Sequence, residues 1–190
     1  MKNSLFANYF KPSLYVRSFK DVNISQLKRQ GIEVFISDLD NTLVPHFKKL
    51  PNKDVLNFIK KVRDANMDFV IISNNIRSRV KKFANKANVE EWYSNARKPF
   101  KFVISKFLKQ RNIHPSKVVI MGDQVIMDIL VANRTKCESI LVQPLVSSTY
   151  KMNWFNLFLE NKIYKSLEKN NILKHGEFDY ELLGREKQLL

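Results

Sequence analysis

The segment Val34-Phe-Ile-Ser-Asp38-Leu-Asp40-Asn-Thr-Leu-Val44 is the most informative part of the chain. Its first three residues are β-branched or aromatic, which is typical of a strand covered on both faces of a sheet. Because alternate residues of an extended chain point to the same side, the carboxylates of Asp38 and Asp40 can meet one ligand. Two carboxylates this close repel each other unless a cation lies between them. The segment therefore predicts a strand that ends in a cation site; an acidic turn in which Asp38 caps a helix is the alternative.

Length and composition limit the remaining possibilities. The chain has 190 residues, enough for one sizeable core and too few for two ordinary domains. The single cysteine, Cys137, excludes a disulfide framework and favours the reducing cytoplasm. No apolar run reaches the roughly 18 to 20 residues of a membrane span, and the first ten residues make a poor signal peptide. We therefore expect a globular cytoplasmic protein.

The formal net charge of +15 favours contact with anions such as phosphates, nucleic acid or acidic lipid head groups. The basic residues are not gathered into one block, so a general bias of composition explains the charge equally well.

Short apolar segments alternate with segments of helical periodicity along the chain. The expected strands are 34–38, 69–72, 92–94, 118–121 and 138–142. The expected helices are 21–30, 51–62 with Pro51 as its first residue, 76–87, 100–108, 125–133 and 155–167. This alternation predicts an α/β fold: a doubly wound, Rossmann-like, mainly parallel five-stranded sheet with helices on both faces.

We expect three parts in the chain: a segment 1–30, a domain 31–168 and a loose polar tail 169–190. Aromatic and basic residues are mixed near both ends, which suits packing on the domain or a place at the inner face of the membrane. The aromatic residues concerned are Phe6, Tyr9, Phe10, Trp154, Phe155 and Phe158.

Polar residues follow the expected strands, where ligands bind in doubly wound sheets. These residues are Asp38, Asp40, Ser73, Lys98 and Asp123. An ionised carboxylate can attack phosphorus once a divalent cation and a lysine neutralise the phosphoryl charge. Magnesium prefers such oxygen ligands and takes few protein carboxylates. The set therefore predicts phosphoryl chemistry with Mg²⁺.

Each group has a role in this prediction. Asp38 and Asp123, helped by Asp128 and the main-chain carbonyl of Asp40, supply oxygen ligands to Mg²⁺. Lys98 supplies a fixed positive charge to the phosphate, and Asp40 transfers the proton. The remaining donors to phosphate oxygens are Ser73 and the amides of Asn74 and Asn75. Taken singly these residues have ordinary explanations, such as a surface lysine, a helix cap and a turn.

The ordered set permits comparison with a known family. It consists of Asp38-Leu-Asp40-Asn-Thr-Leu-Val, Ser73-Asn-Asn, Lys98-Pro and Gly122-Asp123-Gln-x-x-x-Asp128. It resembles the haloacid dehalogenase (HAD) superfamily of phosphatases and, within subclass IIIA, the YqeG branch. That branch is similar to the mitochondrial phosphatases that remove the terminal phosphate of phosphatidylglycerophosphate. Further points of resemblance are Arg79, Asn133-Arg134 and Glu160.

The resemblance implies specific roles. It implies a nucleophile at Asp38, an acid/base at Asp40, a phosphate donor at Ser73, a phosphate-neutralising lysine at Lys98 and a Mg²⁺ ligand at Asp123. Asp128 would be an outer-sphere ligand or would orient Lys98. The chain departs from the family pattern next to the metal site, where it has Met127, Val131 and Ala132.

Related phosphatases often enclose small substrates under an inserted cap. The segments 41–72 and 74–97 are too short for a separate domain of roughly 50 residues or more, so we expect an open site without a cap. An open site suits phosphate on a large molecule, and we expect a lipid phosphate such as phosphatidylglycerophosphate. The alternatives are nucleotides, nucleic-acid ends, phosphoproteins or a basic binding module without turnover. A receiver-type phosphoacceptor is disfavoured because it does not need the second acid, Asp40.

Overall fold

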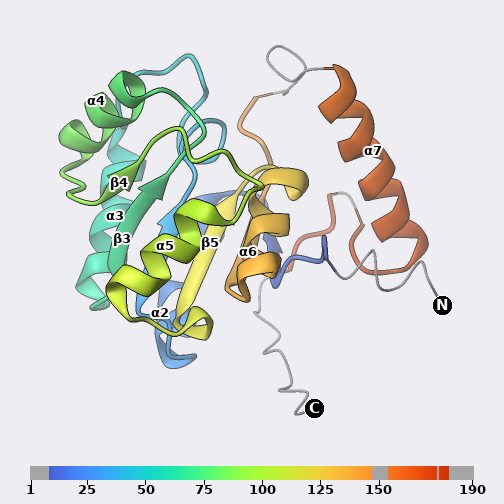
Figure 1. Cartoon of the computed structure of the whole chain (residues 1–190), viewed down its shortest axis with the longest axis horizontal. Coiled ribbons are helices and arrows are strands. Elements are labelled where there is room, and N and C mark those ends of the chain that lie inside the picture. The colour runs from blue at the N-terminus through green and yellow to red at the C-terminus, as the bar shows by residue number, and fades with distance from the viewer. Residues whose placement is uncertain (1–8, 147–153, 175, 180–190) are drawn as a thin grey trace.

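The computed structural model describes residues 9–146, 154–174 and 176–179, and side chains of residues 154–157 are outside this description. A sheet lies at its centre (Figure 1). Its strands are all parallel and follow the order β1-β6-β5-β2-β3-β4. The strands are β1 (Leu14–Val16), β2 (Val34–Ser37), β3 (Asp68–Ile72), β4 (Trp92–Tyr93), β5 (Val118–Gly122) and β6 (Glu138–Val142). The expected doubly wound α/β class is confirmed.

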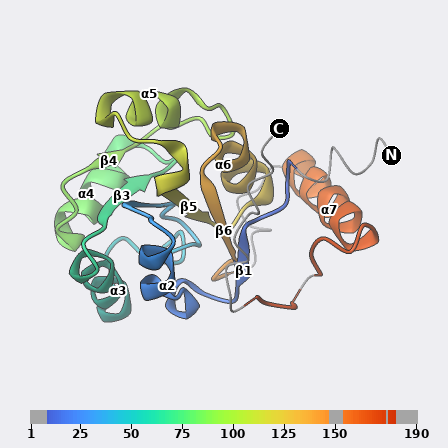
Figure 2. The same cartoon turned by 90° about the horizontal axis from the view of Figure 1, so that it is seen from below.

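Helices cover both faces of this sheet (Figure 2). One face carries α2 (Ile24–Arg29), α3 (Lys53–Asp64) and α4 (Arg77–Ala87). The other carries α5 (Phe102–Arg111), the π-helix Val125–Ile129 and α6 (Leu130–Thr135), with α7 (Trp154–Lys169) at the β1 end. Short 3₁₀ turns occupy Phe19–Asp21 and Pro115–Lys117.

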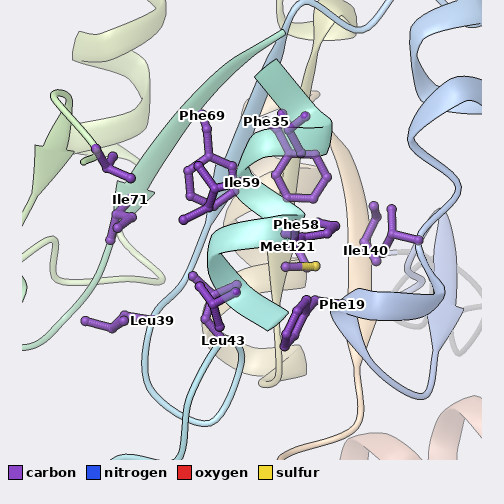
Figure 3. Close-up of a cluster of buried hydrophobic side chains, with 14 of the residues drawn as sticks. Phe19, Phe35, Leu39, Leu43, Phe58, Ile59, Phe69, Ile71, Met121 and Ile140 are labelled. Atoms are coloured by element: carbon purple, nitrogen blue, oxygen red, sulfur yellow. The ribbon is translucent and has the colours of Figure 1, made fainter. Parts of the chain in front are cut away.

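Alternation along the strands divides the core into two sides. In β2, Phe35 faces the α3 side, whereas Val34 and Ile36 face the α5 side. Figure 3 shows Phe35, Phe58 and Phe69 gathered around α3. The ring of Phe35 lies 5.4 Å from that of Phe58 and 5.8 Å from that of Phe69, centroid to centroid. Burying such a side chain contributes about 1.5–3 kcal/mol, so this packing fixes β2 and the acidic segment that follows it.

The sheet has six strands rather than the expected five. The additional strand, β1, pairs with β6 in parallel register and is buried. It was missed because three residues within an aromatic and basic segment give no periodicity to read. Its pairing partner is more than a hundred residues away, a contact that local pattern does not reveal.

Two helix boundaries differ from expectation. Helix α3 begins at Lys53, because the side chain of Asn52 accepts a hydrogen bond from the amide of Val55 and acts as the N-cap. Pro51 therefore precedes the helix instead of opening it. The expected helix 125–133 is a π-helix followed by α6.

Among the described residues, asparagine and not glycine occupies most of the left-handed backbone positions. The chain has four glycines, and the caps that end α4 and α5 are Asn88 and Asn112, with φ of 54° and 48°. Asn41, with φ 62°, turns the chain directly after Asp40. Asparagine tolerates this region better than other residues with a side chain, so the turn at the acidic segment needs no glycine.

The C-terminal segment is not loose where it is described. Leu173 is buried, and the ring of Phe178 lies 4.9 Å from that of Tyr15. The amide of Asp179 donates to the carbonyl of Tyr15 at 2.6 Å. The apolar residues of this polar segment follow no helical or strand period, which is why the sequence predicted a loose tail. The division at residues 30 and 168 stays a prediction.

The aromatic residues near the ends behave differently from one another. Phe10 is buried, whereas Tyr9 and Phe158 are exposed. Phe6 and the side chains of Trp154 and Phe155 lie outside the described residues. Across the described part of the chain, no helix has the length and apolar character needed to cross a bilayer.

Candidate active site

The site forms where the three central strands end. Asp38 directly follows β2, Ser73 follows β3 and Asp123 follows β5. These strands are neighbours, and the amide of Asp38 donates to the carbonyl of Met121 at 2.8 Å. Since adjacent strands lie about 4.8 Å apart, the sheet itself brings the carboxylates of Asp38 and Asp123 together.

Lys98 lies between two carboxylates. Its Nζ donates to Oδ1 of Asp38 at 2.7 Å and to Oδ1 of Asp128 at 2.6 Å, and all three side chains are buried. Burial alone would lower the pKa of Lys98, but the charges of Asp128 and Asp38 outweigh it and raise the pKa above its usual value. The lysine is therefore a permanent cation beside Asp38.

Burial raises the pKa of Asp38, whereas by itself it would lower the pKa of Lys98. Loss of solvent raises the pKa of Asp38 to about 6, although Lys98 acts to lower it and Asp128 acts to raise it. The carboxylate is thus poorly solvated and held by the charge-assisted hydrogen bond from Lys98, and pKa shifts of this kind are typical of functional sites.

Only one carboxylate oxygen of Asp123 accepts a hydrogen bond from a described residue. Its Oδ1 accepts a hydrogen bond from Oγ1 of Thr42 at 3.1 Å. Its Oδ2 is buried and has no hydrogen-bond partner among the described residues. Burial first, and then the charges of Asp128 and Asp38, raise the pKa of Asp123 well above its usual value. An orphaned oxygen in an anionic group is costly unless a cation binds it.

These donors fit a magnesium ion. Asp38 and Asp123 offer hard oxygens at adjacent strand ends, and Mg²⁺ takes one or two carboxylates and keeps several waters. The described residues contain no group of three or more His, Cys, Asp or Glu side chains that could hold a metal.

Gly122 allows Asp128 to approach the end of β5. A Cβ atom at Gly122 would lie 2.1 Å from Cγ of Asp128, a distance that no side chain could tolerate. The Oδ2 of Asp128 also accepts from the amide of Gln124 at 3.2 Å. Asp128 is therefore fixed against the backbone through Oδ2, while its other oxygen, Oδ1, accepts from Lys98.

Asp40 occupies the outer side of the site. Its Oδ1 accepts from Nη2 of Arg79 at 2.9 Å, and its Oδ2 accepts from Nδ2 of Asn75 at 2.6 Å. The same guanidinium donates to the carbonyls of Lys48 and Lys49, at 2.7 and 3.1 Å. Arg79 thus joins the second acid to the loop that follows β2.

The three residues predicted to bind phosphate after β3, namely Ser73, Asn74 and Asn75, have different hydrogen-bond partners. The hydroxyl of Ser73 is buried and accepts from the amide of Asn75 at 3.2 Å, which leaves its proton able to reach a ligand. The side chain of Asn74 instead holds the main chain of Lys98, accepting from its amide at 2.7 Å and donating to its carbonyl at 3.0 Å. The structure therefore uses the amide side chain of Asn74 to position Lys98.

Three contributors had no role assigned from the sequence: Thr42, Arg79 and Glu160. Glu160 of α7 accepts from the amides of Val125 and Ile126, at 2.6 and 3.2 Å, at the start of the π-helix that carries Asp128. Burial raises the pKa of Glu160 to about 7. The sequence could have indicated Glu160 as a lone acid inside an apolar helical stretch. It could have indicated Arg79 by its spacing of four residues from Asn75.

The chain between the site residues is fully described and contains no cap domain. Residues 41–72 hold a loop, α3 and β3, and residues 74–97 hold α4 and β4. The expectation of a site without a cap agrees with this layout.

Comparison with known proteins identifies relatives that are phosphatases. A family described as mitochondrial PGP phosphatase matches residues 3–147. The chain is 27% identical over 173 residues to the "Probable phosphatase YqeG" of Bacillus subtilis (strain 168), covering 91% of this chain and 100% of that protein.

Solved structures show the same fold at low identity. An uncharacterized protein from Listeria monocytogenes serotype 4b aligns with a TM-score of 0.52 and 16% identity, over 72% of this chain and 99% of that one. The cobalt-bound deoxy-D-mannose-octulosonate 8-phosphate phosphatase of Haemophilus influenzae aligns with a TM-score of 0.50 and 12% identity, over 77% and 95%. With the family match over most of its length, the chain belongs to the mitochondrial PGP phosphatase family and is a phosphatase of the HAD type.

Proposed function

We propose that this phosphatase hydrolyses a phosphomonoester through an aspartyl-phosphate on Asp38, with Mg²⁺ as cofactor. The observation that carries the proposal is the buried contact between Lys98 and Asp38, at 2.7 Å, beside the orphaned oxygen of Asp123. A nucleophilic carboxylate, a fixed cation and an unsatisfied hard oxygen are what such a reaction requires.

The first half-reaction forms the covalent intermediate. A carboxylate oxygen of Asp38 attacks phosphorus, and the bond from phosphorus to the ester oxygen breaks. Asp40 in its protonated form gives that proton to the leaving alkoxide. Lys98 and the hydroxyl of Ser73 bind oxygens of the phosphoryl group as its charge moves.

The second half-reaction releases phosphate. Asp40, now a carboxylate, takes a proton from water, and the water oxygen attacks phosphorus of the aspartyl-phosphate. The acyl phosphate bond breaks and restores the carboxylate of Asp38. Arg79 and Asn75 hold both oxygens of Asp40 throughout, so its orientation need not change between the two steps.

Asp38, Asp123 and the main-chain carbonyl of Asp40 would hold Mg²⁺, which would supply neutralisation of the phosphoryl charge. Asp128 acts through its contact with Lys98.

We propose a lipid phosphate, such as phosphatidylglycerophosphate, as the substrate. The family description and the uncapped site support this choice, because an uncapped site can approach a phosphate that projects from a bilayer. Nucleotides, nucleic-acid ends and phosphoproteins are the alternative substrates, and a phosphate-binding module without turnover is the alternative function.

Phosphate release from a panel of phosphomonoesters, with and without Mg²⁺, tests the proposal. We expect Mg²⁺-dependent release by the wild type, no release by Asp38→Asn and very little by Asp40→Asn. Asp64→Asn, an exposed acid in α3, is the matched control and should behave as the wild type. If the wild type hydrolyses nothing and Asp38→Asn differs from it in no property, the chain is a binding module. Faster turnover of nucleotides than of phosphatidylglycerophosphate in vesicles would reject the lipid substrate.

A further inference from the structure

Exposed apolar side chains are concentrated around the candidate active site. Six large hydrophobic residues, which we call the rim surface, are more than a third exposed and come after β2, β3, β4 and β6 in the chain. They are Phe47, Leu50, Ile76, Phe100, Phe102 and Leu145. Phe100 and Phe102 are 66% and 73% exposed, although they lie within four residues of the buried Lys98. Exposed apolar side chains that gather in one region are typical of a binding surface.

Hydrogen bonds join the segments that carry the rim surface. The amide of Leu145 donates to the carbonyl of Asn41 at 2.9 Å, which links the chain after β6 to the chain after β2. The amide of Asn95 donates to the carbonyl of Asn75 at 2.9 Å, which links the chain after β4 to the chain after β3. The segments after β2 and β6 both lie along the upper side of Figure 1. The rim surface therefore borders one edge of the sheet.

The segments that carry Phe47, Leu50, Ile76, Phe100 and Phe102 contain basic but no acidic residues. Residues 41–53, 74–89 and 94–103 contain no Asp or Glu. Exposed basic residues lie among the apolar ones in these segments: Lys48, Lys49, Arg77, Arg97 and Lys101. The ammonium of Lys48 lies 5.9 Å from the ring centroid of Phe47. Apolar tips surrounded by cations complement a surface with an apolar interior and anionic head groups.

We infer that the rim surface docks on an anionic phospholipid bilayer, with Phe47, Phe100 and Phe102 at the level of the head groups. This inference rests on the proposed lipid phosphatase function and gives that function its partner. Docking would direct the uncapped site toward the membrane and bring a lipid phosphate to Lys98 and Asp38 without the lipid leaving the bilayer.

The composition of the rim surface favours a bilayer over nucleic acid. Proteins that bind single strands stack bases on aromatic rings, but Leu50, Ile76 and Leu145 are aliphatic and have no ring to stack. Aliphatic and aromatic side chains both enter the head-group region of a bilayer. The inference also places membrane contact on the loops around the site and not on the ends of the chain.

Sedimentation with vesicles tests the inference. The full chain is mixed with vesicles of phosphatidylcholine, with or without phosphatidylglycerol, at low and high salt. We expect binding to the vesicles that contain phosphatidylglycerol, weakened by salt. Replacing Phe100 and Phe102 by Ser should lower the partition coefficient by about tenfold for each side chain. Lys101→Glu should lower it by about tenfold as well.

Matched variants at the opposite edge serve as controls. Tyr9 is an exposed aromatic residue before β1, and Lys109 is exposed in the last turn of α5, the helix that Phe102 begins. Tyr9→Ser and Lys109→Glu should bind vesicles as the wild type does. Thermal unfolding of every variant shows that the comparison is made on folded protein.

Different failures give different results. If the wild type does not bind anionic vesicles, or if Phe100→Ser/Phe102→Ser binds as well as Tyr9→Ser, the docking inference is overturned, whatever the enzyme hydrolyses. If rim-dependent binding to a single-stranded oligonucleotide occurs without vesicle binding, the inference is also overturned. If vesicle binding depends on the rim surface but no phosphomonoester is hydrolysed, the docking surface stands and the proposed function fails.

Discussion

Thr42 donates a hydrogen bond from its hydroxyl to Oδ1 of Asp123 across 3.1 Å, and Oδ2 of the same carboxylate is buried without a partner among the described residues. The hydrogen bond fixes the direction of the orphaned oxygen. Thr42 comes from the segment after Asp40 and Asp123 comes from the end of β5, so the contact also ties the two acidic segments together.

Magnesium should therefore stabilise the folded protein through Asp123. A free ligand at about 100 times its Kd stabilises the native state by about 2.7 kcal/mol, which thermal unfolding with and without Mg²⁺ will detect. Asp123→Asn should remove this gain. Because the raised pKa of Asp123 favours its protonated form, a metal must displace a proton, and Mg²⁺ affinity should fall as the pH is lowered.

The variant Thr42→Val tests how the orientation of Asp123 affects Mg²⁺ binding while the charge of Asp123 is kept. Loss of a partner that orients a metal ligand typically costs about 10–100-fold in affinity, so this variant should bind Mg²⁺ more weakly than the wild type and better than Asp123→Asn. Equal stabilisation of wild type and Asp123→Asn by Mg²⁺ would contradict a metal at this site.

Arg79 is expected to position Asp40. General acid–base catalysis contributes about 10²–10⁴-fold to a rate, so a misplaced Asp40 in Arg79→Gln should lower kcat by about 10–100-fold on a soluble phosphomonoester. Steady-state kinetics should show KM nearly unchanged, because Lys98 and Ser73 still bind the phosphate. Lys82→Gln, an exposed residue of the same helix, is the control. An unchanged kcat in Arg79→Gln would mean that the ion pair only holds the loop at Lys48.

Asn74 is expected to act on catalysis through the main chain of Lys98. Asn74→Ala removes both hydrogen bonds to Lys98, and leaving such buried groups unsatisfied costs about 1–3 kcal/mol each. We expect lower stability and a lower kcat, measured by urea unfolding and phosphate release. Asn74→Asp keeps the acceptor for the amide of Lys98 and should recover part of the kcat. The exposed Asn57→Ala in α3 should change neither; a lost kcat with no recovery in Asn74→Asp would argue against positioning by the acceptor.

Glu160 should make stability depend on pH. Burial raises its pKa from 4.5 to about 7, so between these values the folded state binds more protons than the unfolded state. Stability from this group is therefore complete below pH 4.5 and is lost as the pH rises through about 7. The loss amounts to about 3 kcal/mol, since one unit of pKa corresponds to about 1.4 kcal/mol.

Urea unfolding across this pH range will measure the effect in wild type and in Glu160→Gln. The neutral variant should lack this component of the pH dependence. Raising the pH from 5 to above 7 should therefore lower the free energy of unfolding of the wild type more than that of Glu160→Gln. Parallel pH profiles for the two proteins would show that Glu160 does not titrate in this range. Glu168→Gln on the same helix provides the comparison for a less buried acid.

The ordered motifs determined the fold class and which polar residues follow its central strands. β-branched runs such as 34–36 can be read from sequence because burial on both faces demands them. In parallel sheets the chain direction then places every carboxyl end at one edge, so Asp38, Ser73 and Asp123 had to meet wherever their strands became neighbours.

The tertiary structure alone decided what holds these residues in place. Three hydrogen bonds illustrate this. Thr42 donates to Asp123, Asn74 donates to the carbonyl of Lys98, and Arg79 donates to Asp40. Each joins residues that are 24 to 81 positions apart in the sequence. Such contacts depend on rotamer and strand order, which no local pattern encodes. The same reason hid β1 and the packing of Phe178 on Tyr15, where short segments gain their stability only from distant partners.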